Sequence, residues 1–509
     1  MESTSVAVDG PGPDDQGAAS SAASGGDKGL KGGAIGFASS VVIGVASTAP
    51  GYSLAASLGF VVAAGVGLFS PAIMWVSFLP MICIACAYYY LNRQDPDCGT
   101  TFTWVTSAMG PTLGWVAGWA IIVADVIVMA NLAQIAGLYS FLLFGVDAPS
   151  TLAVTLIGIG WIAIMTAICY IGIELSARTQ IFLLGAEIAT MALFAVVALI
   201  RVYAGDFPDS IDPSISWLNP LNIDSTTALI NGVLVAVFIY WGWDSAVTVN
   251  EETEDPTEGP GKSAVVSTLI LLGIYVIVSI AAQAVHGEGF LRENKDDVLS
   301  ALGLDVFGSP LDKILIIAVL TSAAASTQTT ILPTARTSLS MGAVRALPRI
   351  FARVHPRYQT PDFSTLLMGA LSIVWYAGLT IISTDILGDS IAALGLMIAF
   401  YYGLTGFACV VFYRREIFRS VKGLLLAGVM PLLGGVSLTY IFVKSISDLS
   451  EPGRRDIFGL GPPVAIAIFF GILGVVLMIL QRIAEPDFFK RKAQVAPPGS
   501  LNPQTEAST

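Results

Sequence analysis

Apolar runs of roughly 20 residues recur along almost the whole chain, and each is long enough to cross the hydrocarbon core of a bilayer. Charged residues make up 12% of the 509 residues, well below the roughly one quarter that is usual in soluble proteins, and the mean hydropathy is +0.75. Within a bilayer, the backbone polar groups must bond to one another, as helices allow. The chain is therefore predicted to be an all-α polytopic membrane protein.

We predict about twelve transmembrane helices, because no polar stretch between the runs is long enough for a folded soluble domain. The predicted helices cover residues 30–63, 71–91, 111–144, 151–172, 176–203, 228–249, 263–285, 311–341, 363–382, 386–413, 423–443 and 461–483. The polar composition of residues 1–27 and 485–509 predicts disordered tails.

The charge pattern predicts an orientation. Most of the 25 Lys and Arg residues fall in the tails and short loops on the side of both termini, which is therefore predicted to be cytoplasmic. The net charge of −12 comes from acidic residues scattered through loops, so we expect the lipid bilayer and a small molecule as partners, and no nucleic acid. The Ala-rich and Gly-rich composition favours a bacterial plasma membrane. No feature of the sequence indicates an oligomeric state.

Two of the predicted helices each contain a break. Residues 45–52 contain Pro50, which has no amide proton, followed by the flexible Gly51, and residues 240–244 place a glycine between two tryptophans. In hydrocarbon, each freed backbone group costs several kcal/mol unless protein or a water-filled cavity receives it. Because each break falls in the first helix of a five-helix group, we predict an inverted repeat of residues 28–203 and 224–413, with 420–484 as a peripheral helix pair.

Three carboxylates lie inside apolar helices: Asp125, Glu187 and Asp244. A charged group at the centre of a membrane helix costs roughly 2.5–3.5 kcal/mol on insertion scales, so each should be protonated, paired or facing water. Such residues usually serve function. The alternative for each is a buried hydrogen bond that only fixes helix packing.

Hydroxyl groups at Ser326 and Thr327 lie in the predicted eighth helix. Oxygen ligands at this depth suit a cation such as sodium. Membrane-helix hydroxyls also commonly bond to carbonyls of their own helix or link neighbouring helices, and this alternative stays open.

The acidic stretch 251–255 follows the second break, at a helix carboxyl end where negative charge is unfavourable on its own. Arg336, Arg345 and Arg349 are candidates to neutralise it in a gate. A solvated acidic loop is the alternative.

Several enzyme and nucleotide signatures are missing from the sequence. Residues 256–263 end like a phosphate-binding loop but begin with Pro256 instead of glycine. No nucleophile and base pair or metal-ligand spacing occurs within the helices. We therefore expect no enzyme and no cofactor, only a proton or possibly a sodium gradient.

Several motifs together resemble the amino acid-polyamine-organocation family of permeases. They are the broken first helix, residues 96–102, the Gly110-Pro111 and Gly118-Trp119 pairs, residues 172–180, Gly242-Trp243-Asp244 with Glu251-Glu252 and Pro256, and residues 345–361. The resemblance covers roughly residues 28–483.

The resemblance implies the leucine-transporter fold, with substrate held between the two breaks. A substrate carboxylate would meet amides of Ser47, Thr48, Ala49 and Gly51, and an amino group would meet carbonyls near Tyr240 and Gly242. An aromatic wall would come from Trp241 or Trp243, and Asp244 would sense the substrate or a proton.

Glu187 departs from the family pattern, because many sodium-independent members carry lysine at the position that it matches. We expect Glu187 to bind the coupling proton, although it could equally complete a cation site with Ser326 and Thr327.

The leading prediction is a secondary active transporter that imports an amino acid by alternating access, coupled to protons. Asp125 and Asp244 favour a cationic substrate. A polyamine transporter, an amino-acid exchanger and a non-transporting substrate sensor are the alternatives. An amino acid would need free amides at the first break for its carboxylate, whereas a diamine would not.

Overall fold

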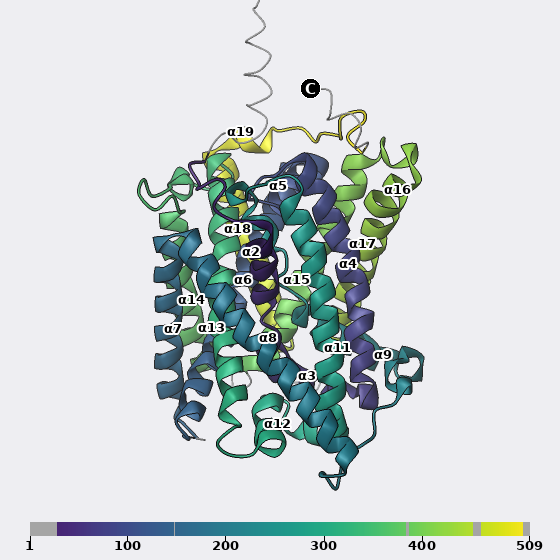
Figure 1. Ribbon diagram of the computed structural model, residues 1–509. Coiled ribbons are helices and arrows are strands. Elements are labelled where there is room, and N and C mark those ends of the chain that lie inside the picture. The colour runs from purple at the N-terminus through teal and green to yellow at the C-terminus, as the bar shows by residue number, and fades with distance from the viewer. Residues whose placement is uncertain (1–27, 147, 383–385, 451–459, 502–509) are drawn as a thin grey trace, which may run out of the picture.

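The computed structural model describes residues 28–501 except 147, 383–385 and 451–459, so the predicted tail 1–27 lies outside the described residues (Figure 1). The described part of the chain is helical, with one isolated bridge between Ile35 and Thr253. The α-helices are α2 (Phe37–Thr48), α3 (Pro50–Val61), α4 (Ser70–Gln94), α5 (Thr101–Met109), α6 (Pro111–Leu143), α7 (Thr151–Ile171), α8 (Ile173–Ala204), α9 (Thr226–Ile239), α10 (Ser245–Thr248), α11 (Gly259–Glu293), α12 (Val298–Phe307), α13 (Lys313–Ala343), α14 (Asp362–Ile382), α15 (Ile386–Tyr413), α16 (Val421–Gly423), α17 (Met430–Leu449), α18 (Pro462–Ala484) and α19 (Pro486–Phe489).

The predicted all-α membrane fold is confirmed. Ten helical stretches of the described chain are long and apolar enough to cross a membrane. The stretch Phe37–Gln94 holds two crossings, since non-helical glycines separate α3 from α4, and the interrupted pair α9 and α10 adds one more. The inverted repeat of residues 28–203 and 224–413 stays a prediction, which requires that its second half begin from the opposite side of the membrane.

The first helix breaks at Ala49, between α2 and α3. Ala49 takes up a left-handed backbone conformation (φ 47°, ψ 66°), and Pro50 opens α3 at a position where a missing amide does little harm. The predicted interruption within residues 45–52 is thus present.

The second break lies between the end of α9 at Ile239 and the start of α10 at Ser245. Gly242 has φ +119°, and a Cβ atom there would lie 2.7 Å from the carbonyl oxygen of Ser47. Only glycine allows the two broken helices to meet this closely, because any side chain would collide with the backbone of the first break.

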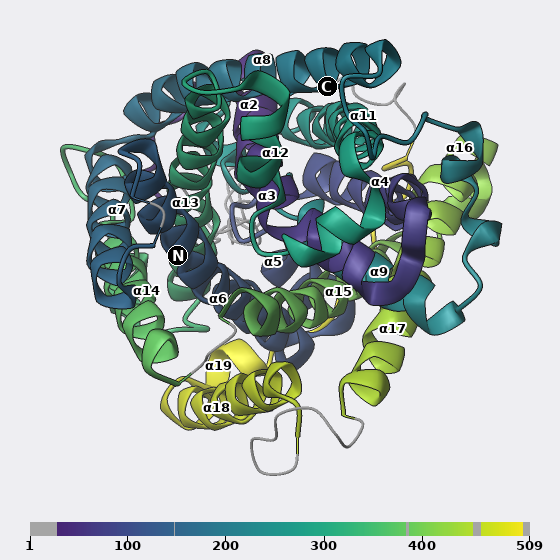
Figure 2. The same ribbon diagram turned by 90° about the horizontal axis from the view of Figure 1, so that it is seen from below.

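Helices α6 and α13 form the most enclosed part of the bundle. In their most apolar windows, 78% and 83% of the residues are buried, against 22% for α18. The view from below shows α6 and α13 within the ring of helices and α18 at its edge (Figure 2). The most enclosed helices are the ones that carry Asp125 and Ser326, so polar groups there are held away from lipid.

Both described ends of the chain lie on one side of the bundle, which we call the terminal face (Figure 1). It comprises residues 28–36, α5, α19 and the loop after α13. The other side, which carries α12, is called the opposite face. Helices α5 and α12 are both absent from the predicted set of helices, since each is too short to cross a membrane.

The tail after residue 485 differs from the predicted disorder over residues 485–501. Phe488 is buried and stacks on Phe102 with ring centroids 5.9 Å apart. The amide of Gln494 donates to the carbonyl of Ser107 (2.6 Å), and that of Ala496 donates to the carbonyl of Phe412 (2.9 Å). A few apolar anchors fix the segment, although its average composition is polar.

Candidate functional site

A cavity lies where the two breaks face each other. Its walls come from the first break, the second break and helices α6, α13 and α15: Ser47, Ile121, Asp125, Trp241, Gly242, Asp244, Ser245, Thr330, Pro333 and Tyr401. Its volume of about 10 Å³ is room for about one water molecule. A larger molecule enters only when the surrounding helices move apart.

Two carboxylates face this cavity. Asp244 accepts hydrogen bonds from the hydroxyls of Tyr401 (3.2 Å) and Tyr88 (3.4 Å), and Asp125 accepts one from the hydroxyl of Thr334. Among the described residues that line the cavity, none is Lys, Arg or His. The wall therefore offers two carboxyl groups and no fixed positive charge, an arrangement that suits a cation.

The amides at the start of α3 are already occupied. The amide of Gly51 donates to Oε1 of Glu187 (2.6 Å), which also accepts from the hydroxyl of Ser322 (2.8 Å). The amide of Tyr52 donates to the Ser322 hydroxyl (3.0 Å). A helix N-terminus attracts negative charge. Here the protein's own carboxylate takes the place that was predicted for a substrate carboxylate.

Three of the residues predicted to bind substrate at the first break lie outside the cavity. Thr48, Ala49 and Gly51 belong to the break, but they do not line the cavity. The Ala49 amide donates to the carbonyl of Ala46 (3.1 Å), and the Thr48 hydroxyl donates to that of Val45 (2.6 Å). These groups satisfy one another within the first helix.

The two predicted ion ligands on α13 make different contacts. The Ser326 hydroxyl donates to the Ser47 carbonyl (2.9 Å), so it reaches the first break. The Thr327 hydroxyl donates to the Ala323 carbonyl of its own helix (2.8 Å). The structure therefore brings Ser326 to the break and leaves Thr327 in the packing arrangement that we weighed as the alternative.

Of the aromatic residues predicted at the second break, one lines the cavity and the others pack elsewhere. Trp241 lines the cavity, and its indole N–H donates to the Tyr401 hydroxyl. Tyr240 instead packs edge-on against Tyr275 at 4.9 Å, and Trp243 packs against Tyr88 at 5.0 Å. Trp241 is the one predicted aromatic residue that the structure places at the cavity.

Sequence reasoning missed Tyr88 and Tyr401, which hold Asp244. A phenol inside an apolar helix needs a hydrogen-bond partner, and a buried carboxylate needs donors. That complementarity was a usable signal in the sequence, but it does not say which phenol meets which acid.

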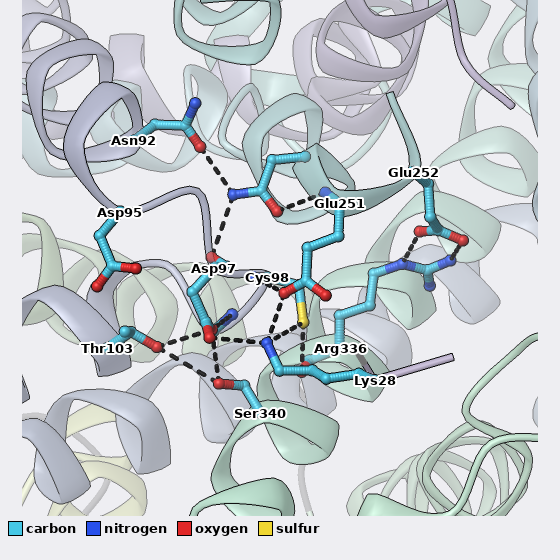
Figure 3. A network of polar contacts seen from close by, with 12 residues as sticks. Lys28, Asn92, Asp95, Asp97, Cys98, Thr103, Glu251, Glu252, Arg336 and Ser340 are labelled. Atoms are coloured by element: carbon cyan, nitrogen blue, oxygen red, sulfur yellow. Dashed lines mark hydrogen bonds and ion pairs between the residues drawn. The ribbon is translucent and has the colours of Figure 1, made fainter. Parts of the chain in front are cut away.

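Charged side chains close the terminal face above the cavity (Figure 3). Arg336 of α13 binds both oxygens of Glu252, at 2.5 and 2.8 Å, and both side chains are fully buried. Of the three arginines considered as partners of the acidic stretch, Arg336 therefore makes the contact. Arg345 lies 3.5 Å from Glu485 instead.

Lys28 completes this closure, and the sequence analysis did not single it out. Its ammonium lies 2.7 Å from Asp97 and 2.5 Å from Glu251, with its side chain only 2% exposed. Burial alone would lower the pKa of Lys28, but the surrounding negative charges, including those of Asp97 and Glu251, outweigh it and raise that pKa above its usual value. Lys28 is therefore held as a cation.

The sequence of the chain matches the family model described as amino acid permease over residues 34–486. This match spans both breaks and every crossing helix. The chain belongs to the amino acid permease family. Members of this family are transporters rather than enzymes, and the permease is accordingly a membrane transporter.

Several known proteins are similar in sequence to parts of this permease. An uncharacterized transporter of Mycobacterium tuberculosis is 26% identical over 342 residues, which are 66% of this chain and 72% of the relative. The low-affinity putrescine importer PlaP of Escherichia coli is 20% identical over 370 residues, covering 72% and 79%. The vacuolar cationic amino acid transporter 4 of Arabidopsis thaliana is 24% identical over 312 residues, covering 57% and 49%.

Proposed function

We propose that this permease is a secondary active transporter that works by alternating access and imports a cargo with at least one ammonium group, a polyamine or a cationic amino acid. The observation that carries the proposal is the pair Asp125 and Asp244 in one cavity between the two breaks. Intramembrane carboxylates that face a cavity mark paths for cations. Two relatives whose names specify putrescine and cationic amino acids are in keeping with this cargo.

The occupied first break favours a polyamine over an amino acid. An amino acid brings a carboxylate that needs donors, but the Gly51 amide already serves Glu187. A diamine brings only donors, which Asp125 and Asp244 can accept at its two ends. A carboxylate-bearing cargo would have to displace the hydrogen bond that the Gly51 amide makes to Glu187.

Glu187 is the proposed proton site. Its Oε1 atom accepts two hydrogen bonds, while its buried Oε2 atom has no hydrogen-bond partner. A proton on Oε2 would remove the cost of a buried, unpaired charge. Release of that proton, when the first break moves, would couple the proton gradient to the cycle. Sodium, held by Glu187 and Ser326, is the competing coupling ion.

The terminal face is proposed to lie in the cytoplasm of a bacterial plasma membrane. The Lys and Arg residues gather on this face, as the positive-inside rule requires. The relatives from Mycobacterium tuberculosis and Escherichia coli support a bacterial setting.

Uptake into liposomes tests the proposal. The purified permease would be tested with labelled putrescine, lysine and leucine under imposed pH or sodium gradients. We expect putrescine and lysine to accumulate when the outside is acidic, and leucine to stay near background. Asp244→Asn should lower amine uptake at least tenfold, whereas Glu174→Gln, at an exposed site on α8, should leave it unchanged.

Coupling is tested separately with Glu187→Gln. Transport in this variant should no longer follow the pH gradient, since the amide cannot carry the proton. Uptake that still follows the pH gradient would refute the proton role. Leucine uptake as fast as putrescine uptake, with Asp244→Asn unaffected, would refute the amine cargo.

A further inference from the structure

The segment that precedes α2 is fastened across the terminal face. The amides of Ala34 and Ile35 both donate to the Glu252 carbonyl, at 2.8 and 3.0 Å, and the Glu254 amide donates back to the Ile35 carbonyl at 3.0 Å. The start of the first helix is thus paired with the loop that follows the second break. The terminal halves of the two broken helices are therefore joined near their ends.

The other side of the contact is anchored on the surrounding bundle. Oδ1 of Asp97 accepts hydrogen bonds from the hydroxyl of Ser340 (2.6 Å), the Gly99 amide (2.7 Å) and the hydroxyl of Thr103 (2.9 Å). Ser340 belongs to α13 and Thr103 to α5. These three bonds fix the orientation of the Asp97 carboxylate. Its other oxygen, Oδ2, accepts a hydrogen bond from Lys28 (Figure 3).

Lys28 joins these two parts from the segment that precedes α2, beside the Asn250 side chain, which donates to the Asp97 carbonyl (3.1 Å). Its ammonium touches Asp97 on the anchored side and Glu251 on the side of the second break, and it lies 3.5 Å from the Cys98 sulfur. The Cys98 amide in turn donates to Oε1 of Glu251 (2.8 Å). Separation of the two parts would leave buried charges without partners, which is strongly unfavourable.

We propose that Lys28 is a gate residue that positions the terminal ends of both broken helices against the Asp97 anchor and so holds the path from the cavity to the terminal face shut. The inference rests on the proposed function, because a gate has meaning only in a transporter. Arg336 forms a second buried contact, but it sits within α13, whereas Lys28 lies on the segment that leads into α2. Withdrawal of Lys28 is therefore the step that frees the first helix.

Cysteine accessibility tests the gate in the full-length permease in membrane vesicles. Thr330 lines the central cavity, so Thr330→Cys, in a background with the five native cysteines replaced, reports access to it. A membrane-impermeant maleimide is added from one face at a time. Lys28→Gln should raise labelling from the terminal face at least tenfold and should lower or leave unchanged labelling from the opposite face.

Two further variants separate a gate from a merely structural role. Lys28→Arg keeps the charge and should return labelling to within about threefold of the parent, given that each tenfold change corresponds to 1.4 kcal/mol. Lys31→Gln removes an exposed lysine three residues away, paired with Glu174, and should change nothing. Increased labelling from both faces in Lys28→Gln would mean general loosening and would overturn the proposal, as would unchanged labelling from the terminal face.

The labelling result and the uptake result can fail independently. If neither putrescine nor lysine is transported but Lys28→Gln still opens the terminal face, the gate stands and the proposed amine cargo falls. If amines are transported but terminal-face labelling does not change, Lys28 is not the gate residue.

Discussion

The two faces of the permease differ in how tightly the helices close over the path between them. At the terminal face, the Arg336 to Glu252 pair is fully buried, and the side chains of Lys28 and Asp97 are only 2% and 8% exposed. Near the opposite face, a cavity of about 450 Å³ lies between the ends of α3 and α17, the middle of α9 and the starts of α15 and α18. Figure 2 shows these helix ends from that side. The structure is therefore a conformation sealed towards the terminal face.

Ion pairs at the opposite face are of another kind. Arg201 contacts Asp206 at 2.9 Å with side chains 33% and 45% exposed. Water screens such a pair, so it contributes little to stability, whereas a buried pair becomes very costly when one member is lost. Ion pairs of similar length are therefore expected to hold the terminal face together and to contribute little at the opposite face.

Arg336→Met should have the largest effect on this contrast. The variant leaves Glu252 buried without its partner, so we expect the free energy of unfolding to fall by about 3–5 kcal/mol. Chemical denaturation in detergent would measure it. The double variant Arg336→Met/Glu252→Met removes both charges and should recover most of the loss. A double variant as unstable as the single one would show that packing, and not the stranded charge, sets the cost.

Asp95→Asn should have an intermediate effect that depends on pH. Burial, together with the charge of Asp97, raises the pKa of Asp95 from 3.8 to about 7. Between these values, the folded permease keeps a proton that the unfolded chain releases, so stability falls as pH rises through that window. Relative to the parent, Asp95→Asn should therefore melt at a higher temperature at pH 8, with the difference shrinking towards pH 4. An offset that is constant with pH would contradict this account.

Asp206→Asn at the opposite face should have the smallest effect. Removal of an exposed pair changes the free energy of unfolding by at most about 1 kcal/mol. The same denaturation series would measure it beside Arg336→Met. A loss of 3 kcal/mol or more would erase the difference between the two faces.

The sequence contained most of the fold. Apolar run lengths set the crossings, and Pro50 and Gly242 marked both breaks, because hydrocarbon tolerates few alternatives to a continuous helix. The acids at the cavity could also be found, since each stands alone in an apolar helix. Asp125 and Asp244 do meet in one cavity in the structure.

The partners of these groups could not be predicted in the same way. Glu187 reaches the Gly51 amide across 136 residues of chain, and nothing local in either segment specifies that contact. Lys28 stands at the edge of a polar tail and looks like any solvated lysine until the fold buries it between Asp97 and Glu251. Pairings between distant segments depend on how the helices pack, which single-sequence patterns do not record.

The two acids of the cavity also set how the transport cycle would respond to membrane voltage. With both Asp125 and Asp244 ionised, a bound diamine of charge +2 would be neutralised, so the loaded step would move little net charge. The empty return step would then carry these two negative charges, together with that of Glu187 after it has released its proton. Each charge that crosses the field is worth about 2.3 kcal/mol per 100 mV, so membrane potential would act mainly on the return of the empty carrier.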